Sequence, residues 1–485
     1  MSTAARNVLM VVVDGHRTDQ LGCYGGALAR TPAIDALAAD GVLCRNAFAV
    51  HSVCMPTRAT LHTGQYPHRH GVWANGVPLP SSSRTLADCL RRAGFATAAC
   101  GKVHFEPQQA YLAAPSPVAD GQRALSPRIP ATAARPYYGF ETVLLSENLL
   151  GREYIDDLRR RAPSAVEDAL SRRTLPAALH DGTWITDQAV GLIGQQAAAR
   201  RPFFCHVSYH ELSPPCSTPA EFVGSVDPSA VRTPVLDPAD LARRPAWYRQ
   251  CYEGYCQRGR QPDDAALRRA IASCHDHMRF IDSQFQRLVA ALQQAGLWES
   301  TVVLYSADHG LSLCDHWQWR HGPFLFDEVT RIPMIWRVPG LTPSGLEADG
   351  LLDQTDVMPT LLDLCGVPVP DGVQGCSQQR LLHQPRQADG KDVVFLQERQ
   401  APDLAVRGVD PASVTQFAVR SRTHKLIGYP GEDFGEFYDL VDDPGEFRNR
   451  WGDPACREAQ RALQDRLEAH LATLPATWPE RHWDW

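Results

Sequence analysis

The chain has 485 residues, of which 44% are hydrophobic, so it can bury a large core of its own. The net charge of −7, with no dominant basic run, argues against binding to nucleic acid or to a membrane surface, and we expect a small-molecule partner. The 14 cysteines are scattered through apolar segments and residues 1–6 lack a charged-then-apolar leader pattern, so we expect reduced thiols in a cytoplasmic protein.

The first 385 residues alternate between short apolar runs and helical patterns. The apolar runs end in Gly, Asp or Ser, which is typical of βαβ units and a mostly parallel sheet. Apolar side chains within residues 267–292 recur alternately four and three positions apart, which predicts a long helix packed on that sheet. The predicted fold class is α/β, with a large, mostly parallel sheet sandwiched by helices over residues 1–385. The predicted strands are residues 8–13, 96–100, 203–208 and 301–306.

Two long segments, residues 106–138 and 213–262, break this alternation. Both are rich in Pro, Ala, Arg and Ser and show little periodicity. Long irregular segments in a compact domain are often lids or binding loops, and disorder is the equally open alternative. We expect these segments to carry specificity or contacts between subunits, and the sequence is compatible with a homo-oligomer.

Residues 386–485 have a different texture and predict a small C-terminal α+β subdomain. Short strand-like runs in this region predict an antiparallel sheet, and a helix over residues 454–474 follows them near the end of the chain. The predicted strands of this subdomain are residues 393–397, 416–421 and 425–429.

Cys54, Pro56 and Arg58 stand at alternate positions before a short helical pattern. Proline favours the first turn of a helix and glycine the position after its end, so residues 56–63 read as a helix closed by Gly64. The N-terminal mouth of a helix favours a tetrahedral anion, and a guanidinium one turn further in matches its oxygens. An isolated cysteine is more often a buried thiol, and this interpretation is the alternative for Cys54.

Acidic residues follow two predicted strands directly. Asp14 comes after the first strand, and Asp308 and His309 come after the strand at residues 301–306. Ligands of an open α/β sheet bind beyond the carboxyl ends of its strands, so these residues can meet in one crevice. Carboxylate oxygens suit Ca²⁺, Mg²⁺ or Mn²⁺. Each residue alone is equally compatible with a helix cap or a turn.

The Cys54-x-Pro56-x-Arg58 frame resembles the signature of the formylglycine-dependent sulfatases, a family with an alkaline-phosphatase-like fold. The resemblance implies that a formylglycine-generating enzyme converts Cys54 to formylglycine. It also implies one divalent metal, which we expect to be Ca²⁺, with Mn²⁺ and Mg²⁺ left open. The metal ligands implied by the resemblance are Asp14, Cys54, Asp308 and His309.

The same resemblance implies roles for four further side chains. Lys102 and His104 lie in a Gly-Lys-x-His motif, where the lysine neutralises an ester oxygen and the histidine positions or deprotonates the formylglycine hydroxyl. His210 matches the first histidine of a family pattern, but Ser213 replaces the second one, which contacts the ester or protonates the leaving group. His321 stands where the family usually has a lysine. We therefore include Arg58, Lys102, His104, His210 and His321 with Cys54 as candidate catalytic residues.

Gly15 is a further departure from the family pattern. The family commonly has Asp or Gln directly after the first aspartate, and glycine has no side-chain ligand to offer. We expect His16 or a water molecule to take that place in the metal site. Asn75 is a candidate for a supporting role.

The sequence thus predicts an enzyme that hydrolyses sulfate monoesters. The first alternative is a phosphonate monoester or phosphodiester hydrolase on the same frame, because these esters also carry one negative charge around a tetrahedral centre. The second is a weakly active relative that binds anions, which Gly15, Ser213 and His321 favour because each removes a family side chain. The last is an unmodified thiol nucleophile at Cys54.

Overall fold

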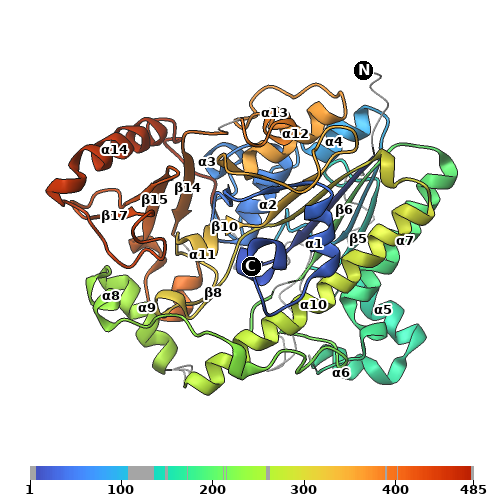
Figure 1. The fold of residues 1–485 in the computed structure, drawn as a ribbon, viewed down its shortest axis with the longest axis horizontal. Coiled ribbons are helices and arrows are strands. Elements are labelled where there is room, and N and C mark those ends of the chain that lie inside the picture. Colours follow the sequence, from blue (N-terminus) through green and yellow to red (C-terminus); the bar gives the residue numbers. More distant parts are fainter. Residues whose placement is uncertain are drawn as a thin grey trace.

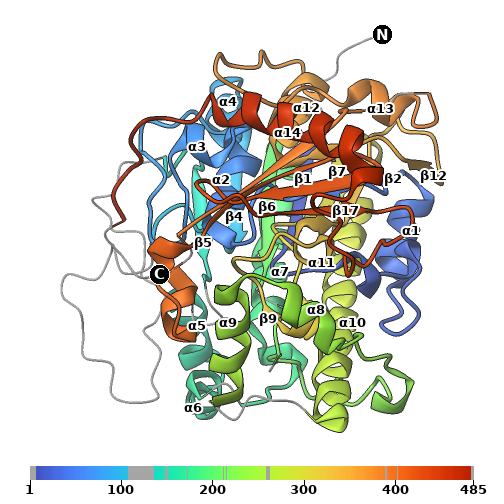
Figure 2. The same ribbon diagram turned by 90° about the vertical axis from the view of Figure 1, so that its left-hand side faces the viewer.

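Eight strands form the central sheet of the protein, in the order β12-β2-β11-β7-β1-β6-β4-β5. The computed structural model describes residues 7–107, 136–147, 151–171, 173–210, 212–214, 216–257, 263–387, 390–400 and 402–481. The five strands β7, β1, β6, β4 and β5 run parallel to one another. Strand β11 (Met334–Arg337) is antiparallel to both of its neighbours, β2 and β7. The predicted mostly parallel α/β sheet is confirmed (Figures 1 and 2).

The four predicted strands of this sheet are present. Their observed bounds extend each prediction by one residue, and the central strand β1 is entirely buried. These strands are β1 (Asn7–Val13), β4 (Ala96–Gly101), β6 (Phe203–Tyr209) and β7 (Thr301–Ala307). The remaining strands of the sheet are β2 (Val42–Cys44), β5 (Thr142–Leu145) and β12 (Leu346–Ala348).

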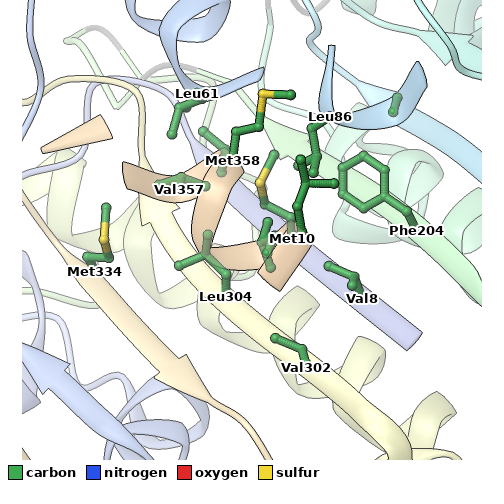
Figure 3. Close-up of a cluster of buried hydrophobic side chains, with 14 of the residues drawn as sticks. Val8, Met10, Leu61, Leu86, Phe204, Val302, Leu304, Met334, Val357 and Met358 are labelled. Carbon is green, nitrogen blue, oxygen red and sulfur yellow. The ribbon is translucent and has the colours of Figure 1, made fainter. Parts of the chain in front are cut away.

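Alternate side chains of β1 face two hydrophobic layers, which explains why this strand is continuously apolar. Met10 and its even-numbered neighbours pack with α2 (Cys54–Thr63), α4 (Leu86–Arg92) and α12 (Val357–Leu364), as Figure 3 shows. Val11 and its odd-numbered neighbours belong to the opposite cluster, which includes side chains of helices α1, α7 and α10. These three helices are α1 (Pro32–Ala39), α7 (Asp181–Ala199) and α10 (Asp264–Gln294).

The long helix predicted over residues 267–292 is α10, and its predicted apolar stripe is buried. The stripe is Leu267, Ile271, Cys274, Met278, Ile281, Phe285, Leu288 and Leu292. Most of the irregular segment at residues 106–138 lies outside the described residues. The other irregular segment differs from the expectation, because it contains α8 (Pro238–Arg243) and α9 (Ala246–Gln257).

An antiparallel sheet and one helix make up the C-terminal unit (Figure 1). Its strands follow the chain order β14 (Val394–Arg399), β15 (Thr415–Arg420), β16 (His424–Gly428) and β17 (Gly435–Asp439). One face of this sheet packs on α14 (Arg457–Leu471) through Leu463 and Leu467, while Ala418, Ile427 and Tyr438 pack toward the large domain. The predicted antiparallel subdomain is thus confirmed. β17 was absent from the predicted strands.

A buried ion cluster also joins the C-terminal sheet to the large domain. Lys425 Nζ lies 2.9 Å from Asp327 Oδ1 and 2.8 Å from Glu446 Oε1, and Arg420 Nη2 lies 3.0 Å from Asp327 Oδ2. Because removing one partner leaves the other charge buried and unpaired, this cluster fixes how the two units meet.

Across the described residues, the helices are all too short or too polar to cross a bilayer.

Gly101 ends β4 at the point where the chain turns into Lys102. Its φ of +92° is unfavourable for other residues, and a Cβ there would lie 1.9 Å from Ser208 O of β6. We predict that Gly101→Ala lowers the free energy of unfolding by about 2–5 kcal/mol, measured by urea denaturation. Gly94→Ala is the matched control, because Gly94 has a φ of +94° and no atom within 4 Å of an added Cβ. Equal losses in the two variants would contradict the predicted clash.

Candidate active site

The candidate active site lies at the carboxyl end of the central strands. Asp14 follows β1, Asp308 and His309 follow β7, and Lys102 follows β4. Helix α2 brings Cys54 to the same place, where its Sγ lies 3.2 Å from His309 Nε2. The topology of a parallel sheet therefore brings together residues that are up to 295 positions apart in the sequence.

Helix α2 begins at Cys54 itself, two residues earlier than predicted. The N-cap residue, Val53, has an apolar side chain that cannot accept a hydrogen bond from the helix. Asn75 from outside the helix does so instead, because its Oδ1 accepts the N–H of Met55 at 3.0 Å. Gly64, with a φ of +65°, ends the helix as predicted. Cys54 is therefore the first residue of a helix that is buried along its whole length.

Four side chains bring one ligand atom each to within 4.8 Å of one another: Asp14, Cys54, Asp308 and His309. His309 Nδ1 lies 2.8 Å from Gly310 O, so the tautomer that donates this hydrogen bond presents the lone pair of Nε2 toward the group. Two carboxylates and one imidazole form a donor set that fits a divalent cation. The predicted ligands thus converge, and their chemistry fits a metal.

Arg58 and Lys102 surround the two aspartates with positive charge. Arg58 Nε donates to Asp308 Oδ2 at 2.8 Å and its Nη2 donates to Asp14 Oδ2 at 3.1 Å. The remaining Nη1 donates to Lys102 O and Ser208 Oγ. The guanidinium therefore binds the aspartates, whereas the sequence pattern favoured a bound tetrahedral anion as its partner. Lys102 Nζ lies 2.7 Å from Asp14 Oδ2 and 3.5 Å from Cys54 Sγ.

The charges at the site set the protonation of its side chains. Burial alone would raise the pKa of Asp14, but Lys102 and Arg58 lower it well below its ordinary value, so Asp14 is ionised. Burial, and then the charge of Asp14, raises the pKa of the Cys54 thiol well above its ordinary value. The protein surroundings of Cys54 thus disfavour a thiolate.

His104 is held by a carboxylate that the sequence analysis missed. Glu147 Oε1 accepts the backbone N–H groups of Val103 and His104 at 3.2 and 3.1 Å, and His104 has a φ of +52°. Burial, and then the charge of Lys102, lowers the pKa of His104 well below its ordinary value. His104 is therefore a neutral imidazole at neutral pH, as a proton acceptor must be.

His210 lies in a separate polar group with Asp181 and Ser146. Its Nε2 is 3.2 Å from Asp181 Oδ2 and 3.1 Å from Ser146 Oγ. Burial opposes ionisation of Asp181, but the neighbouring His210 lowers the pKa of Asp181 below its ordinary value. Among the described residues, His210 is in neither of the two groups of metal-ligand atoms around Cys54. Asp181, the first residue of α7, was not predicted to contact it.

Comparison with known protein families decides the class of this site. The family model "Sulfatase" matches residues 6–367, and the model "N-sulphoglucosamine sulphohydrolase, C-terminal" matches residues 315–473. The chain belongs to the sulfatase family. It is a sulfuric ester hydrolase, and the sulfatase family generally uses a metal ion and formylglycine.

Individual relatives of this sulfatase cover nearly all of its chain. An N-acetylglucosamine-6-O-sulfatase of Bacteroides thetaiotaomicron is 24% identical over 96% of this chain and 86% of its own length. A multifunctional alkaline phosphatase superfamily protein of Trinickia caryophylli is 27% identical over 97% of this chain and 96% of its own. The structure of a phosphonate monoester hydrolase from Silicibacter pomeroyi superposes with a TM-score of 0.81 at 23% identity, covering 97% and 96% of the two chains. The last similarity establishes the fold.

Gly15 serves the metal site of this sulfatase through its backbone. With a φ of +63°, it directs its N–H to Asp308 Oδ1 at 3.1 Å. His16 was expected as a substitute ligand, but its Nδ1 lies 3.0 Å from Gln20 Oε1 and its ring packs edge-on against Tyr305. Within the described part of the chain, His16 belongs to neither group of ligand atoms. The structure therefore does not support His16 as the substitute.

His321 reaches the site, as the sequence analysis expected. Its ring centroid lies 4.7 Å from that of His309, and Cys54, His309 and His321 form a second group of ligand atoms within 4.8 Å. Ser213 is buried, and its Oγ has no hydrogen-bond partner in the described structure. An imidazole thus faces the candidate metal centre of this sulfatase at the position where the family usually has an ammonium group.

The C-terminal unit supports the loops beside Cys54, which the sequence analysis did not predict. Ser52 Oγ donates to Glu398 of β14, a residue 346 positions away. Arg481 Nε donates to Asn75 O at 2.9 Å, and Asn75 in turn caps α2. The sequence around Glu398 and Arg481 gives no signal for these contacts, because their partners are determined only by the tertiary fold.

We predict that Arg58→Lys inactivates the sulfatase and destabilises it. A lysine keeps the charge, but it lacks the planar fork that contacts Asp14 and Asp308 together. The free energy of unfolding should fall by about 2–4 kcal/mol in urea titrations, and turnover should fall by about a hundredfold or more. Arg69→Lys on the exposed side of α3 (Pro67–His70) is the control and should match the wild type. Wild-type stability of Arg58→Lys would contradict this role of the guanidinium.

Proposed function

We propose that this sulfatase hydrolyses sulfate monoesters through a formylglycine derived from Cys54 and with the help of one divalent metal ion. Ca²⁺ is the metal that we propose first. The observation that carries the proposal is the convergence of Asp14, Cys54, Asp308 and His309 within 4.8 Å. Position 54 is thus both a candidate ligand and the residue that the family modifies. A sulfated sugar is the substrate class we favour, because the relative from Bacteroides thetaiotaomicron is named an N-acetylglucosamine-6-O-sulfatase.

Each side chain has a role in this proposed reaction. Formylglycine supplies, as its hydrate, the attacking hydroxyl, and the metal supplies a Lewis acid that lowers the pKa of that hydroxyl. Arg58 holds the carboxylates of Asp14 and Asp308 in place. Lys102, buried between Asp14 and position 54, neutralises charge on the ester oxygens.

Two histidines move protons in this proposal. His104, kept neutral by its surroundings, accepts the proton of the attacking hydroxyl. His210 donates a proton to the departing alcohol, and the adjacent Asp181, 3.2 Å from its Nε2, holds the ring in place. His210 thereby takes over the role of the family histidine that Ser213 replaces.

The proposed modification requires a partner during maturation. Only 1% of Cys54 is exposed in the folded chain. A formylglycine-generating enzyme therefore has to act before α2 is buried, and we propose that it does so on the incompletely folded chain. The cytoplasmic location expected from the sequence stays a proposal.

A phosphonate monoester or phosphodiester hydrolase is the second candidate. These esters present one negative charge on a tetrahedral centre, which the same cations neutralise. The relative from Trinickia caryophylli, which is named multifunctional, is consistent with more than one ester class on this frame.

Relative rates on two aryl esters separate these candidates. We predict that kcat/KM for 4-nitrophenyl sulfate exceeds that for 4-nitrophenyl phenylphosphonate in protein coexpressed with a formylglycine-generating enzyme. Cys54→Ala should abolish both activities, because no aldehyde can form. A higher value for the phosphonate would favour the second candidate. Inactivity toward both esters, with the aldehyde detected at position 54 by mass spectrometry, would favour an anion-binding relative.

The metal content tests the proposed ligands independently of turnover. We predict about one divalent ion per chain by inductively coupled plasma mass spectrometry, and its near-complete loss in Asp308→Asn. Asp19→Asn is the control, because the side chain of Asp19 is 59% exposed and pairs with Arg17 away from the ligand group. Loss of bound metal on dialysis against a chelator should abolish hydrolysis, and added Ca²⁺ should restore it. Retention of metal by Asp308→Asn would overturn the ligand assignment.

A further inference from the structure

Two thiols outside the ligand group lie against each other. Cys216 Sγ is 3.6 Å from Cys274 Sγ, although the two residues are 58 positions apart. Cys216 belongs to the segment that follows β6, and Cys274 belongs to α10. Both are thiols in the structure, and the hydrolytic role proposed above uses neither of them.

Their surroundings give the two thiols different access to solvent. Cys274 is completely buried, and its Sγ lies 3.0 Å from Leu212 O and 3.5 Å from Ala270 O. Cys216 is partly exposed. A reagent in solution can therefore react with Cys216. The adjacent thiol of Cys274 can then attack the modified Cys216 sulfur.

We propose that Cys216 and Cys274 are a site of reversible disulfide formation that tethers the segment after β6 to α10. The oxidant is a small-molecule disulfide such as glutathione disulfide. The Cys216 thiolate attacks one sulfur of the oxidant, forms a mixed disulfide and releases one glutathione thiolate. The Cys274 thiolate then attacks Cys216 Sγ and releases the second glutathione. Two protein thiols lose two electrons in total, and the oxidant gains them.

The tether acts on a segment that already contacts the site. Leu212 N–H donates to Asp14 O at 3.2 Å, so this segment is hydrogen-bonded to the chain at the end of β1. In the reduced protein, noncovalent contacts hold this segment against α10: Cys274 Sγ lies 3.0 Å from Leu212 O, and Asp276 accepts the N–H groups of Gly224 and Val226. A disulfide adds a covalent bond between α10 and Cys216 to these contacts.

A second pair of thiols provides an internal control. Cys100 of β4 and Cys205 of β6 are hydrogen-bonded to each other, as their strands are neighbours in the sheet. Both are buried, with exposed fractions of 0% and 2%. Both pairs thus bring two thiols together, but both members of this second pair are closed to solvent. Only the pair with a partly exposed member is expected to react.

Oxidation of the full-length protein tests the proposal. The protein is incubated with a series of glutathione redox buffers, alkylated and mapped by mass spectrometry under non-reducing conditions. We expect a peptide pair joined through Cys216 and Cys274, reversed by dithiothreitol, while Cys100 and Cys205 remain alkylated as thiols. Hydrogen exchange in peptides containing Cys216 should be slower in the oxidised protein, because the tether restricts that segment.

Two variants make the outcome decisive. Cys216→Ser and Cys274→Ser should each abolish the cross-linked peptide, and Cys274→Ser should leave Cys216 as a lasting mixed disulfide with glutathione. Exposed Cys376 reports whether the oxidant has reached the protein. Modification of Cys376 without a link between Cys216 and Cys274 would overturn the proposal. A mixed disulfide that persists at Cys216 in the wild type would overturn it as well.

Discussion

A buried arrangement of two cations and two carboxylates is the constraint on which the site depends. Arg58 contacts both Asp14 and Asp308, Lys102 contacts Asp14, and all four side chains are buried. Each of these charges alone would be costly to bury, and each is tolerated because the others are fixed within hydrogen-bond distance. The cations also lower the pKa of Asp14 well below its ordinary value, so Asp14 is ionised, which is the state a metal ligand requires. Helix α2 is therefore positioned by its arginine as well as by its apolar face.

The sheet makes this arrangement possible. Parallel strands end at one edge, so the residues that follow β1, β4 and β7 meet there whatever their separation along the chain. The apolar side chains of β1 face helical layers on both sides, which keeps the strand ends in place. The C-terminal unit then supports the loops around the site through Glu398 and Arg481. Removal of that unit would therefore affect the site, although it contributes none of the four ligand atoms.

Departures from the family pattern have different consequences in the structure. Gly15 lacks a side-chain ligand, but its backbone N–H supports Asp308 in a conformation that favours glycine. His321 places an imidazole beside His309, where the family pattern has a lysine side chain. His210 contacts Asp181 and Ser146, in a polar group separate from the ligand atoms. The four candidate ligand atoms thus converge although Gly15 offers no side chain.

The sequence alone determined the type of fold, the central strands and the long helix α10, because these follow from local periodicity. The candidate ligand set around Cys54 was implied by the family resemblance that the Cys54-x-Pro56-x-Arg58 motif carries. Only the tertiary structure decided which partners Arg58 binds, and that Glu147 holds the loop at His104. It also decided that Cys216 meets Cys274. The physical reason is that these contacts join distant segments, and a pairing of this kind is selected by the packing of the whole sheet and its helices.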